Sequence, residues 1–539
     1  MSHLTDPDTK RKKKSVTFRW SWIFAVLLSL KALYMAFYVT PPGDIPDESG
    51  HYAYVRDIAA GEIFPLMHKA MIPNNLWMDT GEPQAYVRDN YIAQHPPLYY
   101  AVAAIPLKAT QLFTAERWYQ IRAARTVSAL SLGLLFLALF WTLVDAGISR
   151  SHALLLASTL GFIPMVSHLA SGITNDIFLF MLCALATRHL VRFVKTQTIR
   201  DAYLCAVWLA LAGATKMTAW ILIAGFVGIM IYELRRPLKA WLLHAAGITG
   251  IALILPAWWM ARNYVHFGNP LKINVVNVPP RLPDYTLLEY LQNQPFFDWM
   301  LVHFYGLIGF SGYCQTPELR HLCTSVRSTR ISSQPYDFMV LVLLTITVLL
   351  LAHTFLRYRR LAKPVASAQP AASLQQWVAN SVRHGGARTA LLGALLIVGV
   401  SVFTVAEINI HHEPGWVAEL ARTMMVAVGL VGILGLGIVL LDTDTDERLL
   451  YYAMVLFLGF GLMILVQGHK AYALLAEMRG VQGRYFYPFL PFMLVALALL
   501  LQRFKVPTVM YLWVVIALAW GELHAYVTQV IPFFEYVKI

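Results

Sequence analysis

Apolar residues occur in long blocks along the chain, separated by short polar segments. Three examples are residues 22–39, 127–144 and 339–356. Blocks of about 17 to 22 apolar residues are long enough to cross the hydrocarbon core of a bilayer as α-helices. The intervening segments are rich in turn-forming Pro, Gly, Asn and Asp. The pattern predicts an all-α, polytopic integral membrane protein with about 13 transmembrane helices.

Composition supports this reading. Hydrophobic residues make up 58% of the 539 residues and charged residues 14%. A soluble globular chain has roughly 25% charged residues, so the low value excludes an ordinary soluble domain. We therefore expect lipid to be the solvent for most of the chain.

The net charge of +13 comes from basic residues near the ends of apolar blocks. The run from Lys10 to Lys14, followed by Arg19, precedes the first block. Such placement indicates membrane topology rather than a nucleic-acid surface, so residues 1–20 are expected in the cytoplasm. Pro41 and Pro42 follow the first block where a cleavage site would need small residues, so this helix is expected to be retained.

The positive-inside rule then assigns sides to the polar segments. Residues 40–125 form the first outer loop, in which residues 97–113 are expected to be a helix at the membrane surface. Residues 271–336 form a second outer segment with an interfacial helix at 287–307. Both segments should lie on the same face of the membrane.

The chain divides into four predicted parts. Residues 1–20 are the basic N-terminus, and residues 21–270 form a transmembrane module whose fifth and sixth helices are hinged near Lys216. Residues 271–336 are the outer segment. Residues 337–539 contain the C-terminal helices, with an outer C-terminus.

The four cysteines do not form a disulfide framework. Cys183 and Cys205 lie inside apolar blocks, where a thiol is usually a small hydrophobic side chain. Cys314 and Cys323 share the second outer segment, where a disulfide and two free thiols both fit the sequence.

Carboxylates and a histidine are concentrated directly after the first helix, at Asp44, Asp47, Glu48 and His51. At the lipid boundary, such a group can bind a divalent cation or take a proton from an acceptor hydroxyl. The structural alternative is a solvated turn in which Asp47 caps the next helix.

Further polar residues fall on the same predicted face, close to helix ends. They are His95, Tyr99, Asn175, Asp176, Lys216, Arg262, Arg484 and Tyr485. Each has an ordinary explanation as a helix cap, a turn residue or a snorkelling side chain. Ionisable groups at membrane depth are costly, however, and cations beside carboxylates suit an anionic phosphate next to a base or metal. Their convergence favours one functional site.

Several short motifs resemble one known superfamily. They are Pro46-Asp47-Glu48-x-x-His51, Pro96-Pro97-Leu98-Tyr99-Tyr100, Asn175-Asp176, Lys216 in a helix hinge, Trp259-x-x-Arg262-Asn263 and Gly483-Arg484-Tyr485. In this order they resemble the GT-C superfamily of membrane glycosyltransferases, which includes protein O-mannosyltransferases and lipid A aminoarabinose transferases. The last two motifs resemble a less characterised bacterial branch.

The resemblance implies a GT-C-like fold and an inverting transfer of a sugar from a polyprenyl-phosphate carrier. The acceptor would be a glycan, a lipid or a protein on the periplasmic face of a bacterial inner membrane. Asp47 would be the general base and Glu48 its acidic partner. The resemblance also implies donor-phosphate contacts at Lys216, Arg262, Arg484 and Tyr485, and acceptor or pocket positions at Asp44, His95 and Tyr99. His51 and Asp176 would lie where a metal ion or the carrier phosphate is bound. Transfer with a divalent metal and transfer without one both fit these residues.

Two other function classes compete with an enzyme of this kind. A flippase or transporter of lipid-linked sugars would also use charged residues within spans, but such proteins usually show internal repeats and midplane sites. Here no repeat is seen, and the ionisable residues gather on one face. A polysaccharide polymerase or ligase would use outer histidines, for which His411, His412 and Glu413 are the candidates. The sugar, the acceptor and the oligomeric state are not encoded in these patterns.

Overall fold

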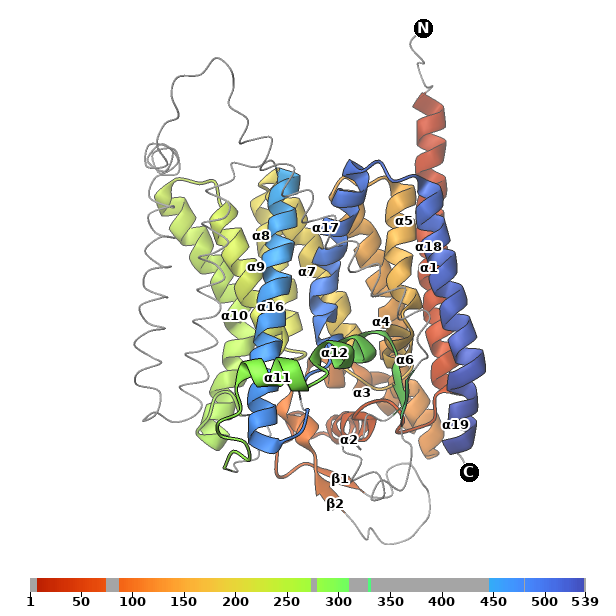
Figure 1. Cartoon of the computed structure of the whole chain (residues 1–539), viewed down its shortest axis with the longest axis vertical. Coiled ribbons are helices and arrows are strands. Elements are labelled where there is room, and N and C mark those ends of the chain that lie inside the picture. Colours follow the sequence, from red (N-terminus) through yellow and green to blue (C-terminus); the bar gives the residue numbers. More distant parts are fainter. Residues whose placement is uncertain are drawn as a thin grey trace.

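Long helices run side by side in the computed structural model, which describes residues 7–73, 87–272, 279–309, 328–330, 445–478 and 480–537. Short helices and two small hairpins form a layer at one end of this bundle (Figure 1). Within the described ranges, seven helices are long and apolar enough to cross a membrane, or eight if one bent pair counts as a span. The predicted all-α, polytopic architecture is confirmed. The total of about 13 stays a prediction.

The N-terminal half of the chain contains long helices and shorter ones. They are α1 (Pro7–Tyr34), α2 (Glu48–Ala59), α3 (Leu98–Gln111), α4 (Arg117–Asp145), α5 (Arg150–Thr159), α6 (Pro164–Ala170), α7 (Asp176–Thr196), α8 (Ile199–Gly213), α9 (Ala219–Glu233) and α10 (Leu238–Phe267). Short 3-10 helices add Tyr91–Gln94 before α3 and Leu160–Phe162 after α5.

The second half supplies two short helices and a C-terminal group. They are α11 (Leu287–Asn293), α12 (Phe296–Tyr305), α16 (Thr445–Leu475), the 3-10 helix η5 (Gly483–Phe489), α17 (Leu490–Arg503), α18 (Thr508–Ala525) and α19 (Ile531–Val537). The apolar block at residues 339–356 lies outside the described residues, as do Cys314, Cys323, His411, His412 and Glu413.

Two antiparallel hairpins were not expected from the sequence. In the first, β1 (Met71–Pro73) pairs with β2 (Val87–Asp89), so that Met71 lies opposite Asp89. In the second, β3 (Leu307–Gly309) pairs with β4 (Ser328–Arg330). Each strand has only three residues, which is too short for the alternating pattern that signals a strand.

The first span ends in a π-helical segment, Met35–Val39, that continues α1. A π-helical turn breaks the regular hydrogen-bond ladder of an α-helix, and such turns are frequent at functional sites. Here α4 binds the carbonyls of this segment: Arg125 Nη1 donates to the Ala36 oxygen at 2.8 Å and Arg122 Nη2 to the Phe37 oxygen at 2.7 Å. The end of α1 is therefore fixed by two arginines from α4.

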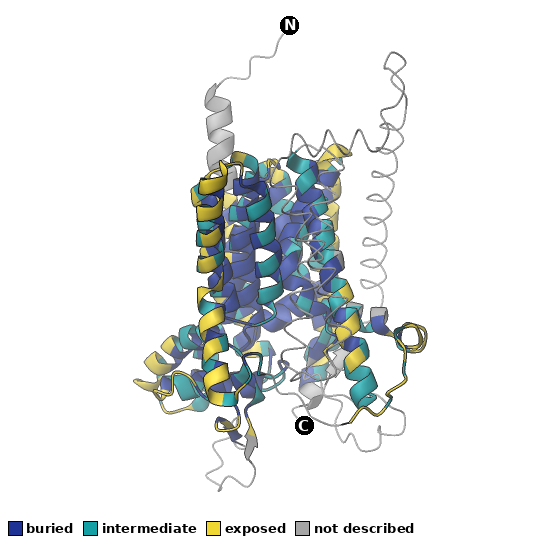
Figure 2. Ribbon diagram, turned by 90° about the vertical axis from the view of Figure 1, so that its left-hand side faces the viewer, coloured by how far each residue is buried: buried dark blue, intermediate teal, exposed yellow. Residues whose placement is uncertain are grey.

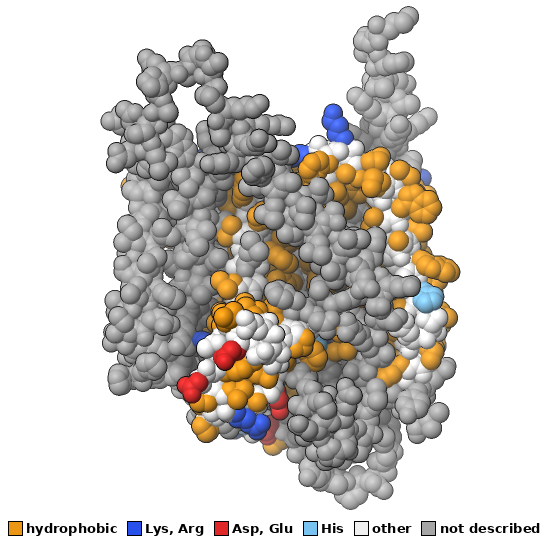
Figure 3. Space-filling model, in the orientation of Figure 1, with side chains coloured by type: hydrophobic (Ala, Val, Ile, Leu, Met, Phe, Trp, Pro, Cys, Tyr) orange, Lys and Arg blue, Asp and Glu red, His pale blue; other side chains and the backbone are white. Residues whose placement is uncertain are grey.

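Burial separates central helices from peripheral ones. The apolar windows of α4 and α7 are each 72% buried, whereas those of α1, α10 and the α18–α19 segment are each 28% buried. Figure 2 shows the buried residues in the middle of the bundle and exposed residues along outer helices. The exposed side chains include Trp513 and Trp520 of α18, and Figure 3 shows hydrophobic side chains covering this edge. Such a surface suits lipid.

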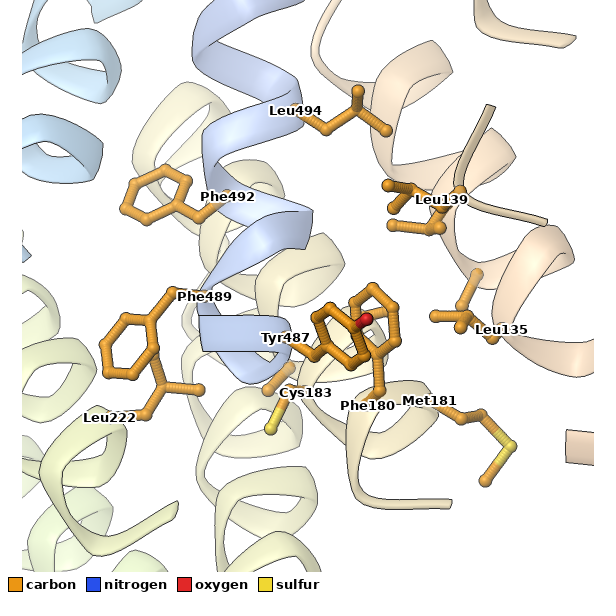
Figure 4. Packing of buried hydrophobic residues seen from close by; sticks show 14 of the residues in the cluster. Leu135, Leu139, Phe180, Met181, Cys183, Leu222, Tyr487, Phe489, Phe492 and Leu494 are labelled. Carbon is orange, nitrogen blue, oxygen red and sulfur yellow. The ribbon is translucent and has the colours of Figure 1, made fainter. Parts of the chain in front are cut away.

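Aromatic packing fixes η5 and α17 in the centre. The Tyr487 ring stacks on Phe180 of α7 at 5.6 Å between centroids, and Phe489 stacks on Phe460 of α16 at 4.3 Å. Figure 4 shows Tyr487 facing Phe180, with leucines of α4 nearby. The backbone that carries the neighbouring residue Arg484 is thus held between α7 and α16.

Ion pairs join the helices at the end opposite to α2. Four of them connect residues far apart in sequence: Asp145–Arg188 (2.7 Å), Lys195–Asp446 (2.9 Å), Glu233–Arg448 (2.8 Å) and Glu447–Arg503 (2.9 Å). These ion pairs and the described parts of the two predicted outer segments thus lie at opposite ends of the bundle (Figure 1). Which end faces the cytoplasm stays a prediction.

Three predicted helices differ in detail from the structure. The span expected after Arg150 is broken at Pro164, which begins α6 at an angle of 72° to the preceding helix. The interfacial helix predicted at 287–307 is two helices, because Pro295 keeps Gln294 extended. The span expected over residues 242–259 continues to Phe267, since Pro256 lies inside α10 without ending it.

Close packing of α1 on α4 depends on Gly133. A Cβ at this position would collide with Ser29 Oγ and the Ala25 carbonyl oxygen of α1. We predict that Gly133→Ala lowers the free energy of unfolding by about 1–3 kcal/mol, the usual cost of overpacking. Thermal unfolding in detergent measures this, with Gly250→Ala as the control because a Cβ there meets no atom within 4 Å. Equal stability of the two variants would contradict the predicted contact.

Candidate active site

A buried ion pair anchors the start of the first outer loop. Arg125 of α4 donates from Nε and Nη2 to the two carboxylate oxygens of Glu48, each at 2.8 Å, and both side chains are fully buried. Arg125 also donates to the carbonyls of Ala36, Thr40 and Pro41. The backbone between the first span and α2 is therefore wrapped around one guanidinium group.

The Glu48 carboxylate receives two further hydrogen bonds from backbone amides. The amide of Gly43 donates to Oε2 at 2.8 Å and that of Ile173 to Oε1 at 2.9 Å. Bidentate pairing with arginine and the two amide donors gives each carboxylate oxygen two hydrogen bonds. Glu48 thus joins the loop, α4 and the chain before α7.

Asp47 precedes this anchor and differs from Glu48 in exposure and backbone. Its φ of 63° is in the left-handed region, and its side chain is 36% exposed. Asp47 is the N-cap residue of α2, but its carboxylate makes no capping hydrogen bond. Instead, Oδ1 accepts a hydrogen bond from the Tyr91 hydroxyl, and Oδ2 lies 3.9 Å from Arg484 Nη2. The simple helix-cap reading therefore does not describe this carboxylate.

Two cations from different segments surround Asp176 at the start of α7. Lys216, between α8 and α9, donates from Nζ to Oδ1. Arg484 of η5 lies with Nε 3.8 Å from Oδ2. All three side chains are at least nine-tenths buried. Since Arg484 also faces Asp47, the structure brings four of the predicted site residues together.

Neutral hydrogen-bonding residues line the neighbouring interior. Asn175 Nδ2 donates to the Tyr100 hydroxyl oxygen at 3.1 Å, and His51 Nδ1 lies 2.9 Å from the same oxygen. A neutral His51 either accepts this hydrogen bond from the Tyr100 hydroxyl or donates to its oxygen, depending on the tautomer. Burial, and then the charge of Lys216, lower the pKa of His51 to about 3. His51 is therefore uncharged at neutral pH.

His95 shares this environment, whereas Tyr99 belongs to the core. Burial, and then Lys216, lower the pKa of His95 to about 3. Its Nδ1 is buried without a hydrogen-bond partner among the described residues, although its carbonyl accepts from Tyr54. The Tyr99 hydroxyl is hydrogen-bonded to Ser128 at 2.8 Å, inside the protein.

The remaining predicted residues lie at different distances from the cations. The Tyr485 ring lies under Lys216, with Nζ 5.7 Å from its centroid. Asp44 is partly exposed in the same loop as Asp47. Arg262 instead binds the carbonyls of Phe64 and Pro65 at 3.1 and 2.9 Å, and it fixes the loop after α2 to α10.

A divalent metal at His51 and Asp176 was one expectation. The described part of the chain contains no group of three or more His, Cys, Asp or Glu side chains able to hold a metal ion. His51 is hydrogen-bonded to Tyr100, and a cation at Asp176 would meet Lys216 and Arg484. These residues do not fit a resident metal ion, so we assign no step to one.

Close backbone contacts position the segments that carry Tyr91 and Arg484. A Cβ at Gly50 would lie 2.5 Å from Ile92 Cγ1, next to the segment that carries Tyr91. Asn90 secures the same contact, since Nδ2 donates to the Gly50 carbonyl at 3.0 Å. A Cβ at Gly483 would collide with the Met300 carbonyl, so α12 packs directly against the residue before Arg484.

Sequence reasoning missed Arg125 and Tyr91, and it gave Asn175 no separate role. Arg125 borders an apolar block, where a basic residue also serves topology, and its partner Glu48 is 77 positions away. The available signal was a charged residue at membrane depth, which is a functional candidate by default. Tyr91 lies in a polar loop and carried no such signal.

One segment of the chain matches a known protein family. Residues 94–260 match the family model described as dolichyl-phosphate-mannose-protein mannosyltransferase, a segment that includes His95, Asp176 and Lys216. This match bears out the resemblance to membrane glycosyltransferases and the enzyme class predicted from the sequence. No curated protein matches the chain.

Three solved structures resemble parts of the chain at low similarity. The ArnT protein from Cupriavidus metallidurans in the apo state has 15% identity and a TM-score of 0.31, and the match covers 90% of this chain and 77% of ArnT. The S. cerevisiae protein O-mannosyltransferase Pmt1-Pmt2 complex bound to the sugar donor has 13% identity and a TM-score of 0.32, covering 49% of this chain and 38% of that one. The Archaeoglobus fulgidus oligosaccharyltransferase in the apo form has 11% identity and a TM-score of 0.33, covering 95% and 55%. The chain thus spans less than two thirds of the yeast and archaeal proteins.

The Glu48–Arg125 pair yields a stability prediction. Arg125→Met would leave a buried carboxylate without its counter-ion, which typically costs about 3–5 kcal/mol. We expect a correspondingly lower free energy of unfolding, measured by denaturant titration in detergent. Arg117→Met, at the start of the same helix and partly exposed, is the control. If both variants unfold at the same denaturant concentration, the anchor role of Arg125 is wrong.

The two buried histidines yield a pH prediction. Their folded pKa values of about 3 lie below the ordinary value of 6.5, so the unfolded chain binds more protons between these limits. The contribution of each histidine to the free energy of unfolding is therefore fully present above pH 6.5. It falls by about 1.4 kcal/mol per pH unit as the pH decreases toward 3. His51→Asn should make the free energy of unfolding less dependent on pH between 6 and 5. An unchanged slope would mean that His51 is not held neutral.

Proposed function

We propose that this protein transfers a sugar from a polyprenyl-phosphate carrier to an acceptor hydroxyl on the outer face of the membrane, with inversion at the anomeric carbon. The observation that carries the proposal is the position of Asp47: a partly exposed carboxylate faces Arg484, and Arg484 and Lys216 share Asp176 behind it. A base and two cations thus lie together at one end of the bundle.

The arrangement suits the charges that change during such a transfer. Asp47 takes the proton of the acceptor hydroxyl while that oxygen forms a bond to the anomeric carbon. The bond between this carbon and the phosphate oxygen breaks, and its electron pair leaves with the polyprenyl phosphate. Lys216 and Arg484 stabilise the charge on the departing phosphate, because ammonium and guanidinium groups donate strong hydrogen bonds to phosphate oxygens.

The other predicted site residues receive supporting roles. Glu48 positions Asp47 through Arg125, since both of its carboxylate oxygens already accept several hydrogen bonds. Tyr485, His95 and Asp44 border the donor and acceptor sites. We leave Arg262 out of the phosphate contacts because its guanidinium binds backbone carbonyls.

Cellular location and partners follow as part of the proposal. We place the protein in a bacterial inner membrane with a cytoplasmic N-terminus, because the basic residues flank the helix ends opposite to the site. The family description names a dolichyl-phosphate sugar donor, which supports a lipid-linked donor here. The acceptor would be a glycan, a lipid or a protein.

Replacement of the base tests the proposal. Asp47→Asn keeps the side-chain volume but removes the proton acceptor, so we expect turnover to fall by about 10²- to 10⁴-fold, the usual contribution of general acid–base catalysis. The assay uses purified protein in proteoliposomes with a panel of polyprenyl-phosphate sugars and measures the release of polyprenyl phosphate.

Asp57→Asn is the matched control, because Asp57 is a partly exposed carboxylate near the other end of the same helix, α2. It should retain near wild-type turnover. Near-normal activity of Asp47→Asn would exclude Asp47 as the base. Donor that crosses the bilayer without being cleaved by the wild type would overturn the enzyme proposal in favour of a flippase.

A further inference from the structure

A second ion pair, with one buried and one partly buried side chain, lies apart from the Asp47 site. Lys31 of α1 donates from Nζ to both carboxylate oxygens of Glu522 in α18, at 2.8 and 3.0 Å. It also donates to Ser167 Oγ of α6 at 2.8 Å and to the Gly161 carbonyl. Ser167 Oγ in turn donates to Glu522, whose side chain is 7% exposed. One ion pair thus joins α1, α6 and α18.

This pair lies within membrane-spanning segments, where charges are rare and costly. Lys31 falls inside the candidate span Arg19–Val39, and Glu522 falls inside Thr508–Phe534. α1 packs mainly on α4, whereas α18 packs mainly on α5. Both are peripheral helices with little buried apolar surface, and apolar contact adds little to helix association in lipid. Their specific contact therefore depends on polar groups such as this pair.

The helix geometry changes just beyond each charge. The π-helical segment Met35–Val39 starts four residues after Lys31, and a second π-helical segment, Tyr526–Val530, starts four residues after Glu522. Both segments lie on the side of the pair that leads to the layer containing α2 (Figure 1). The charges therefore fix the two helices immediately before their regular hydrogen bonding is interrupted.

A continuous series of contacts leads from this pair to the active site. The Thr40 hydroxyl, after the π-helical end of α1, is hydrogen-bonded to Ser171 Oγ at the end of α6, at 2.8 Å. Two residues further on, the amide of Ile173 donates to Glu48. α1 and α6 are thus joined twice, once at Lys31 and Ser167 and again at Thr40 and Ser171, directly before the loop that carries Asp47.

We propose that the Lys31–Glu522 pair is a positioning element for Asp47, which makes the C-terminal helix α18 a required part of the active site. The inference rests on the proposed function. Glu522 compensates the charge of Lys31, so that Lys31 holds Ser167 and the Gly161 carbonyl. The end of α1 and the end of α6 then present Thr40 and Ile173 to the Asp47 loop at fixed positions.

The proposal makes a specific kinetic prediction. The donor-phosphate contacts Lys216 and Arg484 come from other elements, the α8–α9 turn and η5, so loss of the pair should leave donor binding intact. Misplacement of a reacting group by about 1 Å costs up to about 100-fold in rate. We therefore expect Glu522→Gln to lower kcat by about 10- to 100-fold while the donor KM changes by less than about twofold.

The experiment compares four proteins in the proteoliposome assay: wild type, Glu522→Gln, Lys31→Met and the control Asp446→Asn. Both Glu522→Gln and Lys31→Met should lower kcat, because each removes one charge of the pair. Asp446→Asn removes the partly exposed Lys195–Asp446 pair at the opposite end of the bundle and should behave as wild type. Binding of polyprenyl phosphate alone is measured for each protein, with kcat calculated per folded molecule.

The outcomes separate the inference from the proposed function. If wild type releases no polyprenyl phosphate from any donor, the proposed function fails and the inference with it. If wild type depends on Asp47 but Glu522→Gln has wild-type kcat, the inference alone is wrong. A loss of folded protein with unchanged kcat per folded molecule would also overturn it.

Discussion

The active end of this protein depends on one buried guanidinium group. Arg125 binds a carboxylate and three backbone carbonyls, so the chain between the first span and α2 has essentially one path. The π-helical end of α1 leaves the Ala36 carbonyl for this guanidinium, and Glu48 supplies the opposite charge. In lipid, where no water replaces a missing partner, such a set of bonds must form as a whole. The charge distribution around Asp47 follows from that requirement.

Much of the fold was predictable because lipid imposes a simple rule on sequence. Spans must be apolar for about 20 residues, and their ends carry the polar groups, so helices and helix ends could both be located. The breaks within helices were harder. Pro164 and Pro295 divide helices, whereas Pro256 lies inside α10, and only the surrounding packing distinguishes these cases. The short hairpins carry no periodic signal at all.

The candidate site was likewise predictable only in part. Asp47, Asp176, Lys216 and Arg484 were predictable because each is an ionisable residue at the end of an apolar block, and the structure brings them together. The different environments of the adjacent residues Asp47 and Glu48 were not predictable. Adjacent carboxylates look equivalent in sequence, but one is paired with an arginine 77 positions away and the other is partly exposed. Arg262 likewise binds backbone carbonyl groups, and its partners could not be predicted because every residue has a carbonyl group.

The left-handed backbone at Asp47 limits which amino acids this position accepts. Among residues with a Cβ, Asp and Asn enter this region most easily, because their short polar side chains bond locally. A longer acid such as glutamate would carry a carboxylate but would adopt this backbone less readily, and a β-branched residue would be strained. The protein can therefore exchange the carboxylate for an amide far more easily than it can move the carboxylate outward by one methylene. The reach of the acid is set by the backbone, before any substrate is bound.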